Sequence, residues 1–256
     1  MALLLRALAI VSLIVAFTAG AAQPAAASHA WSTYHWGRTA NPFTLGLGSN
    51  VTGDWVGHLS TTSANWSVSS VLDTVVVAGG TTGRKCRPTS GRVEVCNAKY
   101  GSNGWLGLAQ IWLSNGHIVQ GLAKMNDTYF TLDRYNNPNE KQHVMCQEVG
   151  HTFGLGHTSE DGSSQNTCMD YFSNTGVNAG STLSTAPNAH DYEQLELIYA
   201  HLDSTTTVGS LSAAAGFGAD DGNNWGRLVA STARSSTYVR DVSPGKRIVT
   251  HVTWAR

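Results

Sequence analysis

The sequence contains few charged residues and almost no net charge. Only 13% of its 256 residues are Asp, Glu, Lys or Arg, and the formal net charge is −1. Such a balance provides no broad basic surface to attract nucleic acid and no acidic tail to repel it. We therefore expect no nucleic-acid partner. Hydrophobic residues make up 41% of the chain, which is ample for one domain with a substantial core.

A hydrophobic run long enough to cross a membrane is also missing. The apolar stretch at 7–17 follows a positive charge at Arg6 and precedes small residues, and a membrane-spanning helix needs about 20 apolar residues. This arrangement is typical of a cleaved secretory signal. We predict a signal peptide at 1–30, a secreted, extracellular protein, and no membrane association after cleavage.

Cysteine is scarce, and none of the four residues stands in the C-x-x-C spacing that would favour a metal role. Export makes disulfides permissible, and four cysteines allow three pairings. Cys86 and Cys96 flank a Pro/Ser/Gly turn, whereas Cys146 and Cys168 flank a histidine-containing segment. We therefore favour local pairing, Cys86 with Cys96 and Cys146 with Cys168.

The order of the expected elements indicates an α+β domain. Alternating or β-branched residues predict strands at 42–47, 73–77, 92–96, 108–113 and 117–123. Apolar residues at helical spacing predict helices at 53–66, 138–153 and from Pro187-Asn188 onward. The apolar face of the last helix is formed by Tyr192, Leu195, Ile198, Tyr199 and Leu202. Helices and strands do not alternate regularly, as they would in an α/β fold.

The C-terminal part differs in composition from the rest. From Asp203 the chain becomes rich in Ser, Thr, Ala and Gly, which is typical of a linker or long surface loop. Beyond it, 238–242 and 247–254 predict a small hairpin. We therefore predict a catalytic domain at 31–203 and a linker with a small β extension at 204–256, to which the sequence assigns no chemistry.

The segment 147–157 contains the most informative motif. It reads Q-E-V-G-H-T-F-G-L-G-H, the zinc-peptidase pattern H-E-x-x-H-x-x-G-x-x-H with glutamine in the first position. Gln147 and His151 are four residues apart and project from one face of a helix. Gly154 lets the chain leave that helix, so that His157 can return as a third ligand of the same ion.

Glu148 follows the first ligand position and would lie on the open side of the ion. There it can take a proton from a bound water, which is the geometry of metal-assisted peptide hydrolysis. The motif thus predicts Zn²⁺ bound by Gln147, His151 and His157, with Glu148 as general base. An amide oxygen is a harder donor than imidazole and lowers zinc affinity, so copper or another divalent ion stays open.

The segment resembles the metzincin metallopeptidases, and its glutamine variant resembles the one found among gametolysin-type members. The resemblance continues at 167–171, which fits the methionine-containing turn that metzincins place under the metal, with Met169 as its apolar floor. Tyr171 matches the position of a tyrosine that ligates the metal or stabilises the tetrahedral intermediate in astacin- and serralysin-like members. The resemblance covers about 42–202 and implies a twisted, mixed, mostly parallel sheet, an active-site helix and a closing C-terminal helix.

The resemblance implies a secreted metalloendopeptidase. It would act as a monomer on protein or peptide substrates, which would pair with a strand edge beside the cleft. The signal runs almost directly into the domain, so we expect no inhibitory prosegment. The competing hypothesis is a catalytically silent binding module that kept the metzincin fold after losing its first histidine. The retained Glu148 argues against this module, because a binding module has no evident use for a base.

Overall fold

The protein is described by a computed structural model over residues 29–217 and 224–255. Most of the predicted signal peptide, 1–28, lies outside the described residues. The helices are α1 (Trp55–Trp66), α2 (Asp127–Phe130), α3 (Pro138–His151) and α4 (Ala189–Ile198), with a 3-10 turn η1 (Gly176–Asn178). No helix within the described ranges has the length and apolar character needed to span a membrane.

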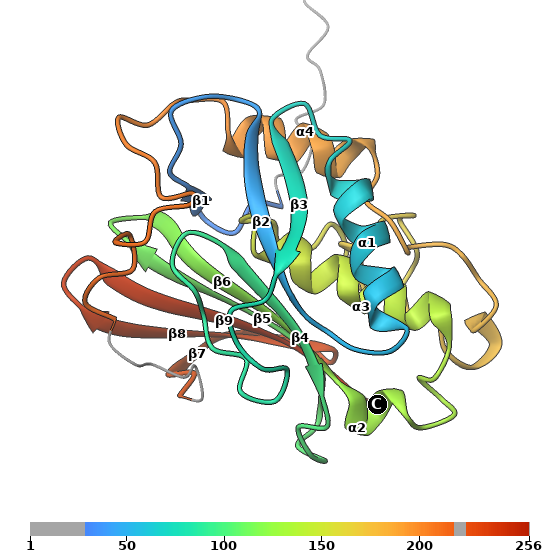
Figure 1. Ribbon diagram of the computed structural model, residues 1–256. Coiled ribbons are helices and arrows are strands. Elements are labelled where there is room, and N and C mark those ends of the chain that lie inside the picture. The colour runs from blue at the N-terminus through green and yellow to red at the C-terminus, as the bar shows by residue number, and fades with distance from the viewer. Residues whose placement is uncertain (1–28, 218–223, 256) are drawn as a thin grey trace, which may run out of the picture.

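The strands form a single mixed sheet (Figure 1). They are β1 (His35–Trp36), β2 (Phe43–Asn50), β3 (Leu72–Ala78), β4 (Val93–Ala98), β5 (Trp105–Ser114), β6 (His117–Asn126), β7 (Arg227–Ser231), β8 (Ser235–Ser243) and β9 (Lys246–Trp254). Their order is β3-β2-β4-β6-β5-β9-β8-β7, and β1 pairs with β6. The predicted α+β class is confirmed. Parallel pairing is confined to β1, β2, β3, β4 and β6, and the other pairings are antiparallel.

The predicted elements recur with shifted ends. Each predicted strand and helix has a counterpart, whereas the short β1, α2 and β7 were not predicted. The last helix ends at Ile198, so Leu202 lies beyond it and is 57% exposed. The C-terminal hairpin forms β8 and β9, but β9 also pairs with β5 from Trp105↔Trp254 to Ser114↔Lys246. The C-terminal strands therefore extend the main sheet.

The sequence around helix α3 contains residues that favour a helix start at Pro138 and a helix end before Gly154. The side chain of Asn137 accepts a hydrogen bond from the backbone N–H of Glu140, and Pro138 occupies the first turn, where its missing N–H costs nothing. Gly154 follows the helix end with φ of 94°, and a Cβ there would lie 2.2 Å from the carbonyl oxygen of Tyr34. Only glycine fits this exit.

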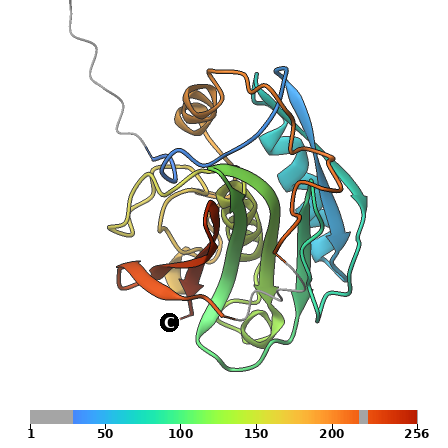
Figure 2. The same cartoon turned by 90° about the vertical axis from the view of Figure 1, so that its left-hand side faces the viewer.

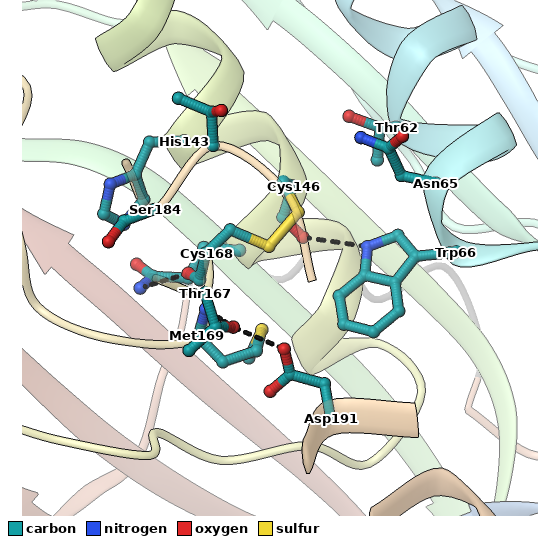
Figure 3. The surroundings of a disulfide bond; sticks show 12 residues. Thr62, Asn65, Trp66, His143, Cys146, Thr167, Cys168, Met169, Ser184 and Asp191 are labelled. Carbon is teal, nitrogen blue, oxygen red and sulfur yellow. Dashed lines mark hydrogen bonds between the residues drawn. A yellow bond between two sulfur atoms is a disulfide. The ribbon is translucent and has the colours of Figure 1, made fainter. Parts of the chain in front are cut away.

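The sheet curves around α3, which packs against β5, β6 and α1 (Figure 2). Both predicted disulfides, Cys86–Cys96 and Cys146–Cys168, are confirmed. The second one joins α3 to the chain before Met169, and the indole of Trp66 donates to the carbonyl of Cys146 at 3.2 Å (Figure 3). The buried core thus fixes α3 between the sheet, α1 and the 167–171 turn.

Gly150 is a point of close contact between α3 and this core. A Cβ at position 150 would lie 2.6 Å from Met169 Sδ and 2.6 Å from Trp66 Cζ2. We expect Gly150→Ala to lower the free energy of unfolding, because overpacking costs about 1–3 kcal/mol and outweighs the gain of about 1 kcal/mol in helix propensity. Urea unfolding measures the change.

Gly57→Ala is the matched control for this substitution. Gly57 lies in α1, is exposed, and a Cβ there would meet no atom within 4 Å. We expect this variant to gain up to about 1 kcal/mol of stability from helix propensity alone. Equal unfolding midpoints for the two alanine variants would contradict the packing of Gly150 described above.

Candidate metal centre

Three imidazoles converge beside α3. His151 ends the helix, His157 follows the Gly154 exit, and His251 lies in β9. One ring nitrogen of each lies within 4.8 Å of one from the others, and their ring centroids are 4.2 to 4.7 Å apart. His151 and His251 are 1% and 2% exposed. The fold therefore brings two residues of the predicted motif together with a histidine from the opposite end of the chain.

The ring nitrogens at this centre are oriented with their lone pairs available. Nδ1 of His151 lies 2.8 Å from the carbonyl oxygen of Leu155, so this nitrogen carries the proton and Nε2 is left unprotonated. Neither Nε2 of His151 nor Nε2 of His157 has a hydrogen-bond partner in the described part of the chain, although both are buried. Buried polar atoms without a partner are costly. A divalent cation would satisfy them, so these residues fit a metal.

Burial also keeps the three imidazoles neutral. It lowers the pKa of His151 and of His251 to about 3, and it lowers the pKa of His157 well below the usual value, with the neighbouring histidines adding to the effect at His151 and His157. Neutral imidazole is the form that binds a metal. Near neutral pH no proton therefore competes for these nitrogens.

Glu148 is fully buried on the same side of α3. Its Oε1 accepts a hydrogen bond of 2.6 Å from Thr253 Oγ1, and its Oε2 lies 3.9 Å from Nδ1 of His251. Burial raises the pKa of Glu148 to about 7, against the lowering effects of His151 and Thr253. A carboxyl group with this pKa can accept and release a proton near neutrality.

Gln147 lies at the edge of this centre and binds the 167–171 turn. Its Nε2 donates to the carbonyl oxygens of Cys168 and Asp170, at 3.0 and 2.8 Å. These bonds orient the amide oxygen toward Thr253, whose hydroxyl lies 3.3 Å away. The amide thus supports the turn, and its role as a metal ligand stays a prediction.

The 167–171 turn places the remaining two predicted residues. Met169 is fully buried beneath the Cys146–Cys168 disulfide, next to Gly150 (Figure 3). The ring of Tyr171 lies against His157, with centroids 4.1 Å apart, and its hydroxyl is hydrogen-bonded to Ser235 of β8. Burial raises the pKa of Tyr171 above its usual value, so the hydroxyl keeps its proton.

His251 and Thr253 are candidate functional residues that the sequence did not predict. Both lie in β9, and as residues two apart on a strand they face the same side of the sheet. The alternation of His251 and Thr253 with apolar residues was the one available signal. It indicated a strand with one polar face, but it could not indicate that this face meets α3.

The centre is covered from two sides. Strand β9 lies along β5, and the ring of Trp31 packs over the imidazoles, 5.4 Å from His151 and 6.0 Å from His251 between centroids. A cavity of about 120 Å³ reaches Gln147, Tyr171 and Thr253 from outside. Thr253 therefore stands between this cavity and Glu148.

Another histidine group lies elsewhere, at the start of the described chain. Nε2 of His29 lies 3.2 Å from Oδ1 of Asp191, both side chains are buried, and the ring of His190 stacks on His29.

A search of protein-family models and of curated protein sequences gave no match to this chain. Any function proposed for this chain therefore rests on its sequence motif and on the geometry of the candidate metal centre.

The third metal ligand can be identified by comparing two substitutions. Loss of a residue that only supports a metal ligand costs about 10–100-fold in metal affinity. We expect His251→Ala to weaken zinc binding at this centre by more than this. Gln147→Ala should stay within that range, because the Gln147 amide is bonded to the turn. Chelator competition with metal analysis measures both affinities.

His58→Ala serves as the control in this comparison. His58 lies in α1, and its Nδ1 lies 2.9 Å from the side-chain oxygen of Gln142. Its loss should leave zinc affinity unchanged. A larger loss from Gln147→Ala than from His251→Ala would restore the ligand set that the motif alone predicts.

Proposed function

We propose that the protein is a secreted, metal-dependent endopeptidase. The observation that carries this proposal is the convergence of three neutral, buried imidazoles with the carboxyl group of Glu148. The metzincin-like motif, and the position of Met169 and Tyr171 after it, support the same chemistry. The two disulfides are consistent with an oxidising, extracellular environment.

His151, His157 and His251 are the residues that would hold the cation. Three imidazoles are a common zinc ligand set that leaves a position open for water, and imidazole also suits copper. When bound, zinc supplies a Lewis acid that polarises a carbonyl group and lowers the pKa of water. The hydrogen bond between His151 and the carbonyl of Leu155 keeps one ring in the tautomer that this binding requires.

Glu148 transfers the proton in this proposal. Its carboxylate removes a proton from the attacking water, and the resulting carboxylic acid delivers it to the amine of the leaving peptide. A pKa of about 7 suits both steps. The Thr253 hydroxyl positions Oε1, and it must release Oε1 or share it when a water arrives from the cavity side.

Tyr171 is the second catalytic residue in this proposal. Its phenol stays protonated and can donate a hydrogen bond to the oxygen on which negative charge develops. In the described arrangement the hydroxyl is bonded to Ser235. Tyr171 must therefore exchange Ser235 for the substrate, which makes its position depend on the C-terminal hairpin.

Substrate binding requires a strand edge, and β9 occupies the nearest one. An extended peptide adds to a sheet through backbone hydrogen bonds. Strand β5 lies against α3, but β9 pairs with β5 along the whole length of β5. A substrate strand therefore binds when β9 separates from β5, and the cavity beside Gln147 accommodates one of its side chains.

A catalytically silent binding module is the second candidate. The observation that favours it is the burial of Glu148 behind Thr253 and β9, because a working base needs access to water. In this alternative, Glu148 is retained for its hydrogen bond to β9. The two candidates differ in whether peptide bonds are cleaved.

Proteolysis of unfolded protein distinguishes the two candidates. We expect the mature protein, 31–256, to cleave it in the presence of zinc and to lose this activity with chelator. Glu148→Ala should lower kcat/KM by at least the about 10²–10⁴-fold that general acid–base catalysis contributes. Product analysis by mass spectrometry measures the rate.

The outcome that rejects the peptidase is equal cleavage by the wild type and Glu148→Ala. No cleavage by either, with zinc bound to both, favours the silent module. Glu196→Ala is the control: Glu196 is exposed in α4, and its Oε1 accepts a hydrogen bond from the hydroxyl of Ser70.

Displacement of β9 can be followed without catalysis. We expect an extended peptide bound to the Glu148→Ala variant to speed hydrogen exchange at the amides of Lys246–Trp254, because these amides lose their partners on β5. Exchange in β2 and β3, at the other end of the sheet, is the internal control. Unchanged protection of β9 with peptide bound would contradict this route of access.

A further inference from the structure

A second group of imidazoles lies apart from the candidate metal centre and shares no residue with it. His35 lies in β1, His117 begins β6, and His201 and Asp203 follow α4. Strand pairing brings the first two side by side, with His35 opposite His117. The chain thus gathers three histidines and a carboxylate from three distant segments.

The donor atoms of this group converge on one oxygen. Nε2 of His35, His201 and His117 lie 3.5, 3.5 and 3.1 Å from Oδ1 of Asp203. Nε2 of His35 and Nε2 of His201 are 3.2 Å apart. Ligands that lie about 2.0–2.1 Å from a tetrahedral zinc ion are separated by roughly 3.3 Å. These four distances are therefore close to the edges of a zinc coordination sphere.

The tautomer of His35 favours a cation between its Nε2 and Oδ1 of Asp203. Its Nδ1 lies 2.7 Å from the carbonyl oxygen of Thr33, so Nδ1 carries the proton. In the neutral ring, Nε2 then has a lone pair that faces the carboxylate of Asp203. Two lone pairs at this distance repel each other unless a cation lies between them. Either a metal ion or a second proton on His35 can supply it.

Arg38 fixes the orientation of Asp203. Its Nη1 and its backbone N–H donate to Oδ2 at 2.9 and 3.1 Å, and its side chain is 2% exposed. Oδ2 is thereby occupied, and Oδ1 is turned toward the three imidazoles. Two hydrogen bonds from one buried arginine to the same carboxylate oxygen are the kind of support that metal ligands receive.

We propose that His35, His117, His201 and Asp203 form a second metal site, for a divalent transition metal and zinc by its donor set. Three imidazoles and one carboxylate oxygen favour zinc over magnesium or calcium, which prefer oxygen ligands. His35, His201 and Asp203 form the closer set. Nε2 of His117 lies 3.1 Å from Oδ1 of Asp203 but outside that set, and it becomes the fourth ligand when its ring turns toward the metal. With four protein ligands the site is structural.

The proposed site would hold three distant parts of the fold together. A metal there joins β1 to β6 and to the segment after α4. The same N-terminal segment carries Trp31, which covers the candidate metal centre. Binding to the folded state alone stabilises it in proportion to the logarithm of metal concentration. This second site does not depend on the proposed peptidase activity.

Metal content and cobalt spectroscopy of the mature chain test the proposal. We expect wild type to hold one more equivalent of zinc than His201→Ala, whose exposed side chain can be lost without unfolding. Repeating the comparison in a His157→Ala background removes the contribution of the first centre. His117→Ala should weaken binding less than His35→Ala, because the closer set stays complete.

A cysteine at position 201 locates the metal directly. His201→Cys keeps a zinc ligand, so it should retain the equivalent that His201→Ala loses. With Co²⁺ it should show a thiolate-to-cobalt charge-transfer band that wild type lacks, since both cysteine pairs are disulfides. His58→Ala is the matched histidine control and should keep the full zinc content.

Equal zinc content in wild type and His201→Ala, together with no such band in His201→Cys, would overturn the proposal. The group would then be a set of imidazoles hydrogen-bonded to Asp203 without a metal. Loss of peptidase activity plays no part in the readout, so the failure of this site and the failure of the proposed function are distinguishable.

Discussion

The burial of polar side chains on α3 is the constraint on which the rest of the structure depends. The helix lies between the sheet and α1, and its polar residues are almost completely enclosed. Each buried polar group needs a partner, because leaving it without one costs about 1–3 kcal/mol. Different elements supply these partners: α1 contacts Gln142, the 167–171 turn contacts His143 and Gln147, and β9 contacts Glu148. Nε2 of His151 and Oε2 of Glu148 are left without a hydrogen-bond partner, and both lie at the candidate metal centre.

Strand β9 both contributes to the candidate metal centre and covers it. It contributes His251 to the group of imidazoles, and it also covers Glu148 and the edge of β5. In the proposed peptidase, the strand that completes the ligand set therefore competes with the substrate for the same edge. The release of β9 would change access and ligand set together, which links substrate binding to the state of the metal.

The two histidine groups share one kind of hydrogen bond. In each, a ring Nδ1 is bonded to a backbone carbonyl, at Leu155 for His151 and at Thr33 for His35. This bond fixes the tautomer and presents Nε2 to the other donors. The groups differ in their surroundings. The first is enclosed and includes a fully buried carboxyl group beside the imidazoles, whereas the second is partly exposed and has its carboxylate held by Arg38. Their proposed roles, catalytic and structural, follow from this difference.

By itself the sequence determined the local features: the α+β class, most elements, both disulfides, and the approach of His151 to His157. These follow from short-range rules, since helical spacing and the Gly154 exit act within a few residues. Only the tertiary structure decided that His251 and Thr253 meet Glu148 and that His35 meets Asp203. Those contacts depend on which strands become neighbours across long separations, and the residues involved carry no mutual spacing that a sequence pattern could reveal.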